Sequence, residues 1–162
     1  MNHPIRRKDR ALGEEETLKL LADCEYGTLA TVDAAGQPYC TPLSYIFKDG
    51  VIYFQSALKG HKIDNLAHSA KVCFSVVGPT QPIYDGSFTT YYSSVVAFSA
   101  AFEVTDPEQK TKALYALAEK YLPGDMDKAD RDISRSLKAT AVYGIRPDWI
   151  TGKAKKKKEG TA

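Results

Sequence analysis

Apolar residues recur along the chain in two patterns, one typical of helices and one typical of strands. The helical spacing runs through Leu18, Leu21 and Ala22 and recurs in later segments. We expect helices over residues 14–24, 61–70, 107–121 and 126–137. Alternation of apolar and polar residues, rich in β-branched and aromatic side chains, predicts strands over residues 26–33, 39–47, 51–55, 71–77, 88–104 and 140–150.

Short connections between these strands favour antiparallel pairing. Asp49-Gly50 is a hairpin signal, whereas residues 78–87 contain two prolines and two glycines and are expected to form a loop. Residues 88–104 fit either one bent strand or two. About six strands with inserted helices predict a mainly β fold, a small barrel or a sandwich. Without a linker or repeat, we expect one domain over residues 1–152 and a disordered lysine-rich tail over 153–162.

The charge distribution argues against a nucleic-acid-binding body. The chain has a formal net charge of +2, but five lysines and one glutamate lie in residues 153–162. The remaining residues are slightly acidic, so the folded part lacks the basic surface that nucleic acid requires. No apolar run approaches the roughly 20 residues of a membrane helix. The basic N-terminus has no apolar segment after it, and the three cysteines lack C-x-x-C spacing, so we expect a reduced, cytoplasmic protein.

Common catalytic and metal-binding patterns are missing from the sequence. There is no G-x-S-x-G motif and no P-loop, and three histidines are too few for a convincing triad or metal cluster. Four aspartates at 125, 127, 130 and 132 lack the glycine and the terminal glutamate of a calcium loop. We therefore expect no metal site and assign no catalytic residue.

One segment predicts an anion site. A strand ends near Ala57, Gly60 supplies a turn, and a helix opens with His61 and Lys62. The first turn of a helix has free N–H groups and the positive end of the helix dipole, so two basic side chains there favour a phosphate. A solvated pair of basic residues is the alternative. The helix should turn a polar side, with Asn65 on it, to solvent.

The order of several short motifs resembles the pyridoxamine 5′-phosphate oxidase-like flavin-binding split barrels, and is most similar to the nitroimidazole-resistance (Nim) type. The similarity covers roughly residues 5–154. The motifs that carry it are Tyr26-Gly27-Thr28-Leu29-Ala30-Thr31, Thr41-Pro42-Leu43-Ser44-Tyr45, Ile52-Tyr53-Phe54-Gln55-Ser56-Ala57, Gly60-His61-Lys62, Val72–Gly78, Tyr92-Ser93-Ser94-Val95 and Trp149–Lys153.

This resemblance implies a six-stranded antiparallel split β-barrel of Greek-key type and a homodimer that holds two molecules of flavin mononucleotide (FMN) at its interface. It implies that His61 and Lys62 hold the phosphate, with Ser44 and Ser56 nearby. It places the isoalloxazine ring against Thr28, Leu29, Ala30, Thr31, Phe54, Gln55, Ser56 and Ala57. Ser94 and Trp149 are assigned to the partner side or its rim.

The implied function is that of an FMN-dependent oxidoreductase that reduces small acceptors such as nitroaromatics with a nicotinamide donor. Many relatives carry His at the position of Gln55 and Arg at the position of His61. Gln cannot titrate, which puts a mechanism that needs that imidazole in doubt. A non-catalytic protein that binds or senses flavin, haem or deazaflavin is the alternative. Pyridoxamine 5′-phosphate oxidation ranks third, because the C-terminus here becomes a lysine tail.

Overall fold

The computed structural model describes residues 4–84, 86 and 88–157. Its helices are α1 (Glu14–Asp23), α2 (His61–His68), α3 (Pro107–Tyr121) and α4 (Met126–Ser136), with short 3-10 turns η1 (Lys8–Arg10) and η2 (Pro123–Asp125). Its strands are β1 (Tyr26–Val32), β2 (Pro38–Ser44), β3 (Ile46–Lys48), β4 (Val51–Ala57), β5 (Lys71–Val77), β6 (Gln81–Tyr84), β7 (Phe88–Glu103), β8 (Thr140–Ile145) and β9 (Trp149–Lys155).

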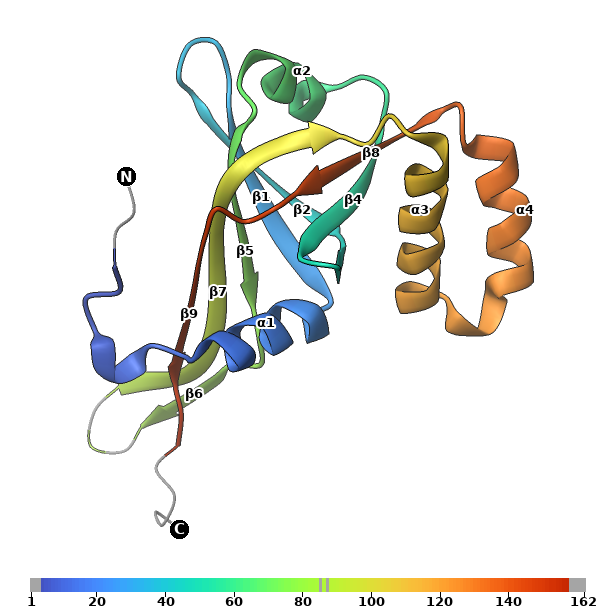
Figure 1. Cartoon of the computed structure of the whole chain (residues 1–162). Helices are drawn as coiled ribbons and strands as arrows, with labels where there is room; N and C mark the ends of the chain where they lie inside the picture. Colours follow the sequence, from blue (N-terminus) through green and yellow to red (C-terminus); the bar gives the residue numbers. More distant parts are fainter. Residues whose placement is uncertain (1–3, 85, 87, 158–162) are drawn as a thin grey trace.

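The strands form one antiparallel sheet that curls into a split barrel. The order is β2-β1-β5-β7-β8-β4-β3, with β6 and β9 also paired to β7. The long strand β7 is therefore the central strand, which pairs with β5, β6, β8 and β9 (Figure 1). The predicted class, mainly β with inserted helices, is confirmed, and residues 88–103 form one strand rather than two.

The expected number of six strands is wrong, because the described part of the chain has nine. The strand predicted over 39–47 breaks at Tyr45, and the one predicted over 140–150 breaks before Pro147, which lacks an N–H and restrains the residue before it. The expected loop contains β6, which pairs with the start of β7.

The expected tail begins too early. Strand β9 extends to Lys155, and Lys153 and Lys155 pair with Ser94 and Tyr92 of β7. A domain boundary at residue 152 therefore falls inside a strand. Residues 158–162 of the expected tail lie outside the described residues.

Two apolar clusters hold the sheet and helices together. The larger fills the barrel and includes Leu21 of α1, Leu29, Phe54 and Phe74, all fully buried. The smaller joins α3 to the outer side of β8 through residues such as Leu117 and Val142. Because a fully buried side chain of this size contributes about 1.5–3 kcal/mol, these clusters fix where the helices sit.

The helices leave one side of the sheet uncovered. Helices α1 and α2 lie at opposite ends of the barrel, and α3 with α4 packs beside β4 and β8 (Figure 1). The outer side of β2, β1, β5, β7 and β9 carries exposed apolar side chains, including Tyr26, Val77 and Phe98. In the described residues, no helix is both long and apolar enough to cross a membrane.

Candidate functional site

The start of α2 combines a tight turn with an uncapped helix end. Gly60 has φ of 132°, a conformation that L side chains rarely adopt, and it turns the chain from β4 into the helix. Its carbonyl accepts from the N–H groups of Ile63 (2.8 Å) and Asp64 (3.0 Å). In the part of the chain that the structure describes, no side chain caps the helix. Because the Ile63 N–H is bonded to Gly60, the first-turn N–H groups left for a ligand in the described structure are those of His61 and Lys62, at the positive end of the helix dipole.

Lys62 adds a cation at this helix end. Its side chain is half-buried, and its Nζ lies 5.4 Å from the centre of the Phe54 ring. Burial lowers the pKa of the Lys62 ammonium. No salt bridge within the described chain involves Lys62. A desolvated ammonium without a carboxylate is stabilised by an anionic ligand, so Lys62 suits a phosphate.

Packing contacts fix the other side of α2. The ring of His61 stacks on that of Tyr39 of β2, with centres 4.1 Å apart and planes 29° apart. Asn65 donates through Nδ2 to Thr31 Oγ1 (3.0 Å), and both side chains are buried. The helix is thereby held against β1 and β2 on one side and against Phe54 of β4 on the other.

Residues that sequence analysis grouped as a ring-binding surface alternate between two sides of the sheet. Thr28 and Ala30 of β1 are half-buried and lie on the uncovered side. Leu29 is fully buried in the core, and Thr31 is buried against Asn65. Because strand residues alternate, only Thr28 and Ala30 present side chains to a ligand on that side.

The segment of β4 behaves in the same way. Phe54 is fully buried inside the barrel, and Ser56 shares its side. Gln55 and Ala57 are exposed on the opposite side, where Gln55 pairs with Val142. Val142 packs in the cluster beneath α3, so Gln55 does not share a surface with Phe54 and Ser56.

The uncovered side forms an open face whose rows follow from strand register. Here the open face means the outward residues of β2, β1, β5, β7 and β9. One row runs across Ala30, Cys73, Phe98 and Trp149, and the next across Thr28, Ser75, Val96 and Thr151. Small and apolar side chains about 4.8 Å apart within each row give a shallow surface for a planar ring.

Trp149 adds a polar group to this face. Its indole Nε1 is buried and has no hydrogen-bond partner among the described residues. Trp149 lies opposite Phe98, which is 47% exposed. An indole N–H left without a partner can donate to a ligand that covers this row.

Two predicted serines lie away from the α2 end. Ser44 is opposite Tyr26 at the far end of β2, and the next residue, Tyr45, donates its backbone N–H to the Tyr121 hydroxyl. Five residues separate Ser44 from Tyr39, which is roughly 17 Å along a strand. The expected position of Ser44 near the phosphate is therefore wrong within one chain. Ser94 lies on the open face between Val77 and Lys153.

Sequence analysis missed two residues of the site, Tyr39 and Asn65. Alternation along β2 places Tyr39 on the same side as Leu43, but nothing in the sequence pairs its ring with His61. Asn65 was expected on the polar side of the helix, yet it is 2% exposed. Its burial depends on Thr31, which lies far away in the sequence, and no local pattern reports that contact.

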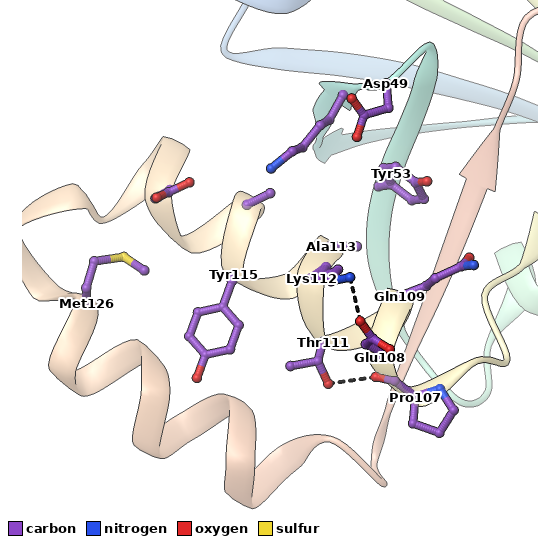
Figure 2. Close-up of a pocket in the computed structure, with 13 residues that line it drawn as sticks. Asp49, Tyr53, Pro107, Glu108, Gln109, Thr111, Lys112, Ala113, Tyr115 and Met126 are labelled. Carbon is purple, nitrogen blue, oxygen red and sulfur yellow. Dashed lines mark hydrogen bonds and ion pairs between the residues drawn. The ribbon is translucent and has the colours of Figure 1, made fainter.

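A separate cavity of about 970 Å³ lies between α3, α4 and the β3–β4 hairpin (Figure 2). Its lining includes Tyr53 and Met126 but none of the predicted site residues. Lys112 and Glu108 form an ion pair at 2.6 Å, and the Thr111 hydroxyl donates to the Pro107 carbonyl (2.7 Å). These groups satisfy one another, so they give no distinct preference for a ligand. Within residues 4–157 as described, no three metal-ligating side chains gather.

The fold and site define a split-barrel protein with a helix end that carries a half-buried lysine, and with an open apolar sheet face. The sequence profile of the family described as pyridoxamine 5′-phosphate oxidase matches residues 13–154. The chain therefore belongs to this family, as the motif order predicted. No curated protein matches the chain.

Solved structures share the fold at low sequence identity. A candidate 5-nitroimidazole antibiotic resistance protein from Bacteroides thetaiotaomicron is 17% identical, with a TM-score of 0.73 over 94% of this chain and 96% of that one. A flavocytochrome from Azotobacter vinelandii is 19% identical, with a TM-score of 0.82 over 96% and 73%. An FAD-binding protein from Mesorhizobium loti is 23% identical, with a TM-score of 0.65 over 91% and 98%.

Proposed function

We propose that the protein binds a flavin, FMN, with its phosphate at the start of α2. The observation that carries this proposal is Lys62, a half-buried ammonium whose pKa is lowered by burial and which has no salt bridge in the described chain. A phosphate dianion supplies the missing charge, and the first-turn N–H groups supply donors. His61 is held on Tyr39 at the same end.

The flavin ring would lie on the open face. Thr28 and Ala30 offer small side chains on it, and the Trp149 indole has an unused donor among the described residues. Relatives of the same fold support this proposal, because two of them are described as a flavocytochrome and an FAD-binding protein. The residues fit a planar ring with a polar edge.

We further propose that two copies pair through the open face. Phe98, Val77 and Tyr26 are 47%, 61% and 56% exposed on it. An uncovered apolar sheet face of this kind marks an interaction surface. A second copy would bury these side chains and enclose the ring on its other side.

The proposed activity is reduction of small acceptors such as nitroaromatics with a nicotinamide donor. A bound flavin supplies the redox chemistry, accepting and delivering electrons. The protein binds the phosphate, orients the ring and excludes water. Gln55 lies on the α3 side of β4 and has no titratable proton, so it does not act as a general base.

Flavin binding is tested by the visible spectrum of the purified protein and by titration with FMN. We expect flavin absorbance and an FMN affinity that falls at least tenfold in Lys62→Met, because a charge-assisted contact is lost. Lys138→Met, an exposed lysine between α4 and β8, should bind FMN as the parent does. Equal affinities for all three proteins would contradict the phosphate assignment, and a Soret band without flavin absorbance would favour haem.

The activity has a separate test. The reduced FMN-loaded protein should be reoxidised by a nitroimidazole faster than free reduced FMN is. If the two rates are equal, and a panel of donors and acceptors gives no turnover, the protein is a binding or sensing module. That result leaves the binding proposal standing and removes the oxidoreductase.

A further inference from the structure

Segments from both ends of the sequence meet in a basic cleft beside β9. Residues 7–12 run along this edge strand, where Ala11 bridges to Lys153 and the Leu12 N–H donates to the Gly152 carbonyl (2.9 Å). The cleft has a volume of about 910 Å³. Five basic and two acidic residues line it, so positive charge is in excess.

The two acidic residues of the basic cleft are already engaged. Asp9 pairs with Arg7 at 2.6 Å, and Glu16 pairs with Lys156. Arg10 and Lys155 have no carboxylate partner among the lining residues. Both are half-buried, so solvent screens their charges less than it would on an open surface.

Arg10 is also one of two cations near the Tyr92 side chain, the other being Lys153. Arg10 and Lys153 both lie close enough to the Tyr92 hydroxyl to lower its pKa. Burial raises the pKa of this phenol, and the two cations outweigh it, so the pKa is lowered. Arg10 and Lys153 therefore add positive charge next to the cleft.

Aromatic surface adjoins these cations. Tyr91 lines the cleft and is half-buried, and Lys155 Nζ lies 5.7 Å from the centre of its ring. Lys155 also donates to the Thr89 hydroxyl, which fixes the ammonium above the strand. A tyrosine ring next to positioned cations provides a stacking surface beside an anion site.

We propose that the basic cleft binds a nucleoside phosphate. The phosphate lies between Arg10 and Lys155, and the base stacks on Tyr91. A concave cleft of about 910 Å³ has the size of a small-molecule site, which favours a mononucleotide over an extended polymer or a lipid surface. The flavin is assigned to other residues, at the start of α2 and on the rows of the open face through Ala30 and Thr28, whereas Lys155 lies at the far end of β9.

The direct test titrates ADP into protein saturated with FMN, so that the α2 end is occupied. Calorimetry should detect ADP binding, with adenosine at least tenfold weaker and with an affinity that falls as salt is raised. Amide NMR shifts should move at Ala11, Leu12 and Ala154 and remain fixed at His61 and Lys62. Shifts confined to His61 and Lys62, or no ADP binding, would overturn the proposal.

Variants separate charge from stacking. Arg10→Gln with Lys155→Gln should weaken ADP at least tenfold, whereas Tyr91→Leu should weaken ADP and adenosine alike. Lys138→Gln is the charge-matched control and should leave ADP binding unchanged. Thermal unfolding checks that each variant folds, and the NMR mapping of the parent needs no variant.

Two other probes test other sources of phosphate. Vesicles of phosphatidylglycerol and phosphatidylcholine, and a ten-nucleotide uridine RNA, present the same anion on a membrane and on a polymer. Binding of either probe through Arg10 and Lys155, without binding of ADP, would overturn the proposal of a nucleotide site. Weaker binding of both probes than of ADP supports it.

Discussion

The Tyr121 hydroxyl of α3 accepts a hydrogen bond from the backbone N–H of Tyr45 at 2.9 Å. Tyr45 is the single residue between β2 and β3, where the edge strand breaks. The same hydroxyl lies 3.0 Å from the Tyr45 carbonyl oxygen. One side chain from α3 thus satisfies backbone groups that the interrupted strand leaves unpaired, and it links the helix to the place where the barrel splits.

Tyr121→Phe should lower the free energy of unfolding by about 1–3 kcal/mol, because it leaves a buried N–H without a partner. Chemical denaturation of the parent and the variant measures the difference. Tyr115→Phe is the matched control, since the Tyr115 hydroxyl bonds only to the exposed Asp130 carboxylate. If both substitutions lower the free energy of unfolding by the same amount, the contact of Tyr121 with the Tyr45 backbone does not contribute the expected stability.

Gly27→Ala should also destabilise the protein, by about 1–3 kcal/mol from overpacking. A methyl group at Gly27 would meet Phe74 Cζ at 2.1 Å, and the Phe74 ring is fully buried. Gly124→Ala, where nothing lies within 4 Å, should change stability little. Combining Gly27→Ala with Phe74→Leu should recover part of the loss beyond additivity; strict additivity would argue against the clash.

The FMN affinity should depend on pH through Lys62. Burial lowers the pKa of this ammonium in the free protein, and a bound phosphate would raise it again. The complex then holds more protons than the free protein between those two pKa values, so affinity falls as pH rises through that window. Protonation of the phosphate weakens binding below about pH 6.

Fluorescence titration of FMN across this range measures the profile. In Lys62→Met the alkaline fall should disappear, whereas the acidic limb, which belongs to the ligand, should remain. An alkaline fall of the same size in the variant would assign it to another group.

Phe98→Arg should disrupt the proposed homodimer. Phe98 is 47% exposed at the centre of the open face, and a charge there would have to be buried between two copies. We expect the dissociation constant of the dimer, measured by analytical ultracentrifugation, to rise at least 30-fold, which corresponds to about 2 kcal/mol. Leu122→Arg, at a side chain 53% exposed beyond α3, should leave the dimer intact. A monomeric parent would contradict the pairing directly.

Local patterns predicted the strands and helices well because their causes are local. Alternation located β1, β4 and β5, and the Asp106-Pro107 cap located the start of α3, where the Asp106 carboxylate accepts from the Gln109 N–H. The break at Pro147 was also visible in the sequence, but the apolar run around it concealed the boundary. Strand β6 contains Pro82 and is stabilised by pairing with β7, which no local pattern reports.

The site was predicted less completely, because it depends on which side of a strand each residue faces and on contacts distant in sequence. The motif containing Thr28 to Thr31 was identified, but register against β5 decides that Thr28 faces outward and Leu29 inward. The motifs that contain Ser44 and Lys62 lie near each other in the sequence, but the two residues lie at different ends of the barrel. The contacts of Lys62 with Phe54 and of Asn65 with Thr31 could be identified only from the folded structure.

Strand β7 has a consequence for how the molecule comes apart. It pairs with β5, β6, β8 and β9 at once, and β9 joins it from about fifty residues further along the sequence. Without this strand, the ladder β2-β1-β5 and the ladder β8-β4-β3 would no longer be joined to each other. Unfolding should therefore be cooperative, and the central amides of β7 should exchange with solvent only when the whole domain opens. Folding should be slow for its size, since the last partners of β7 are distant in the chain.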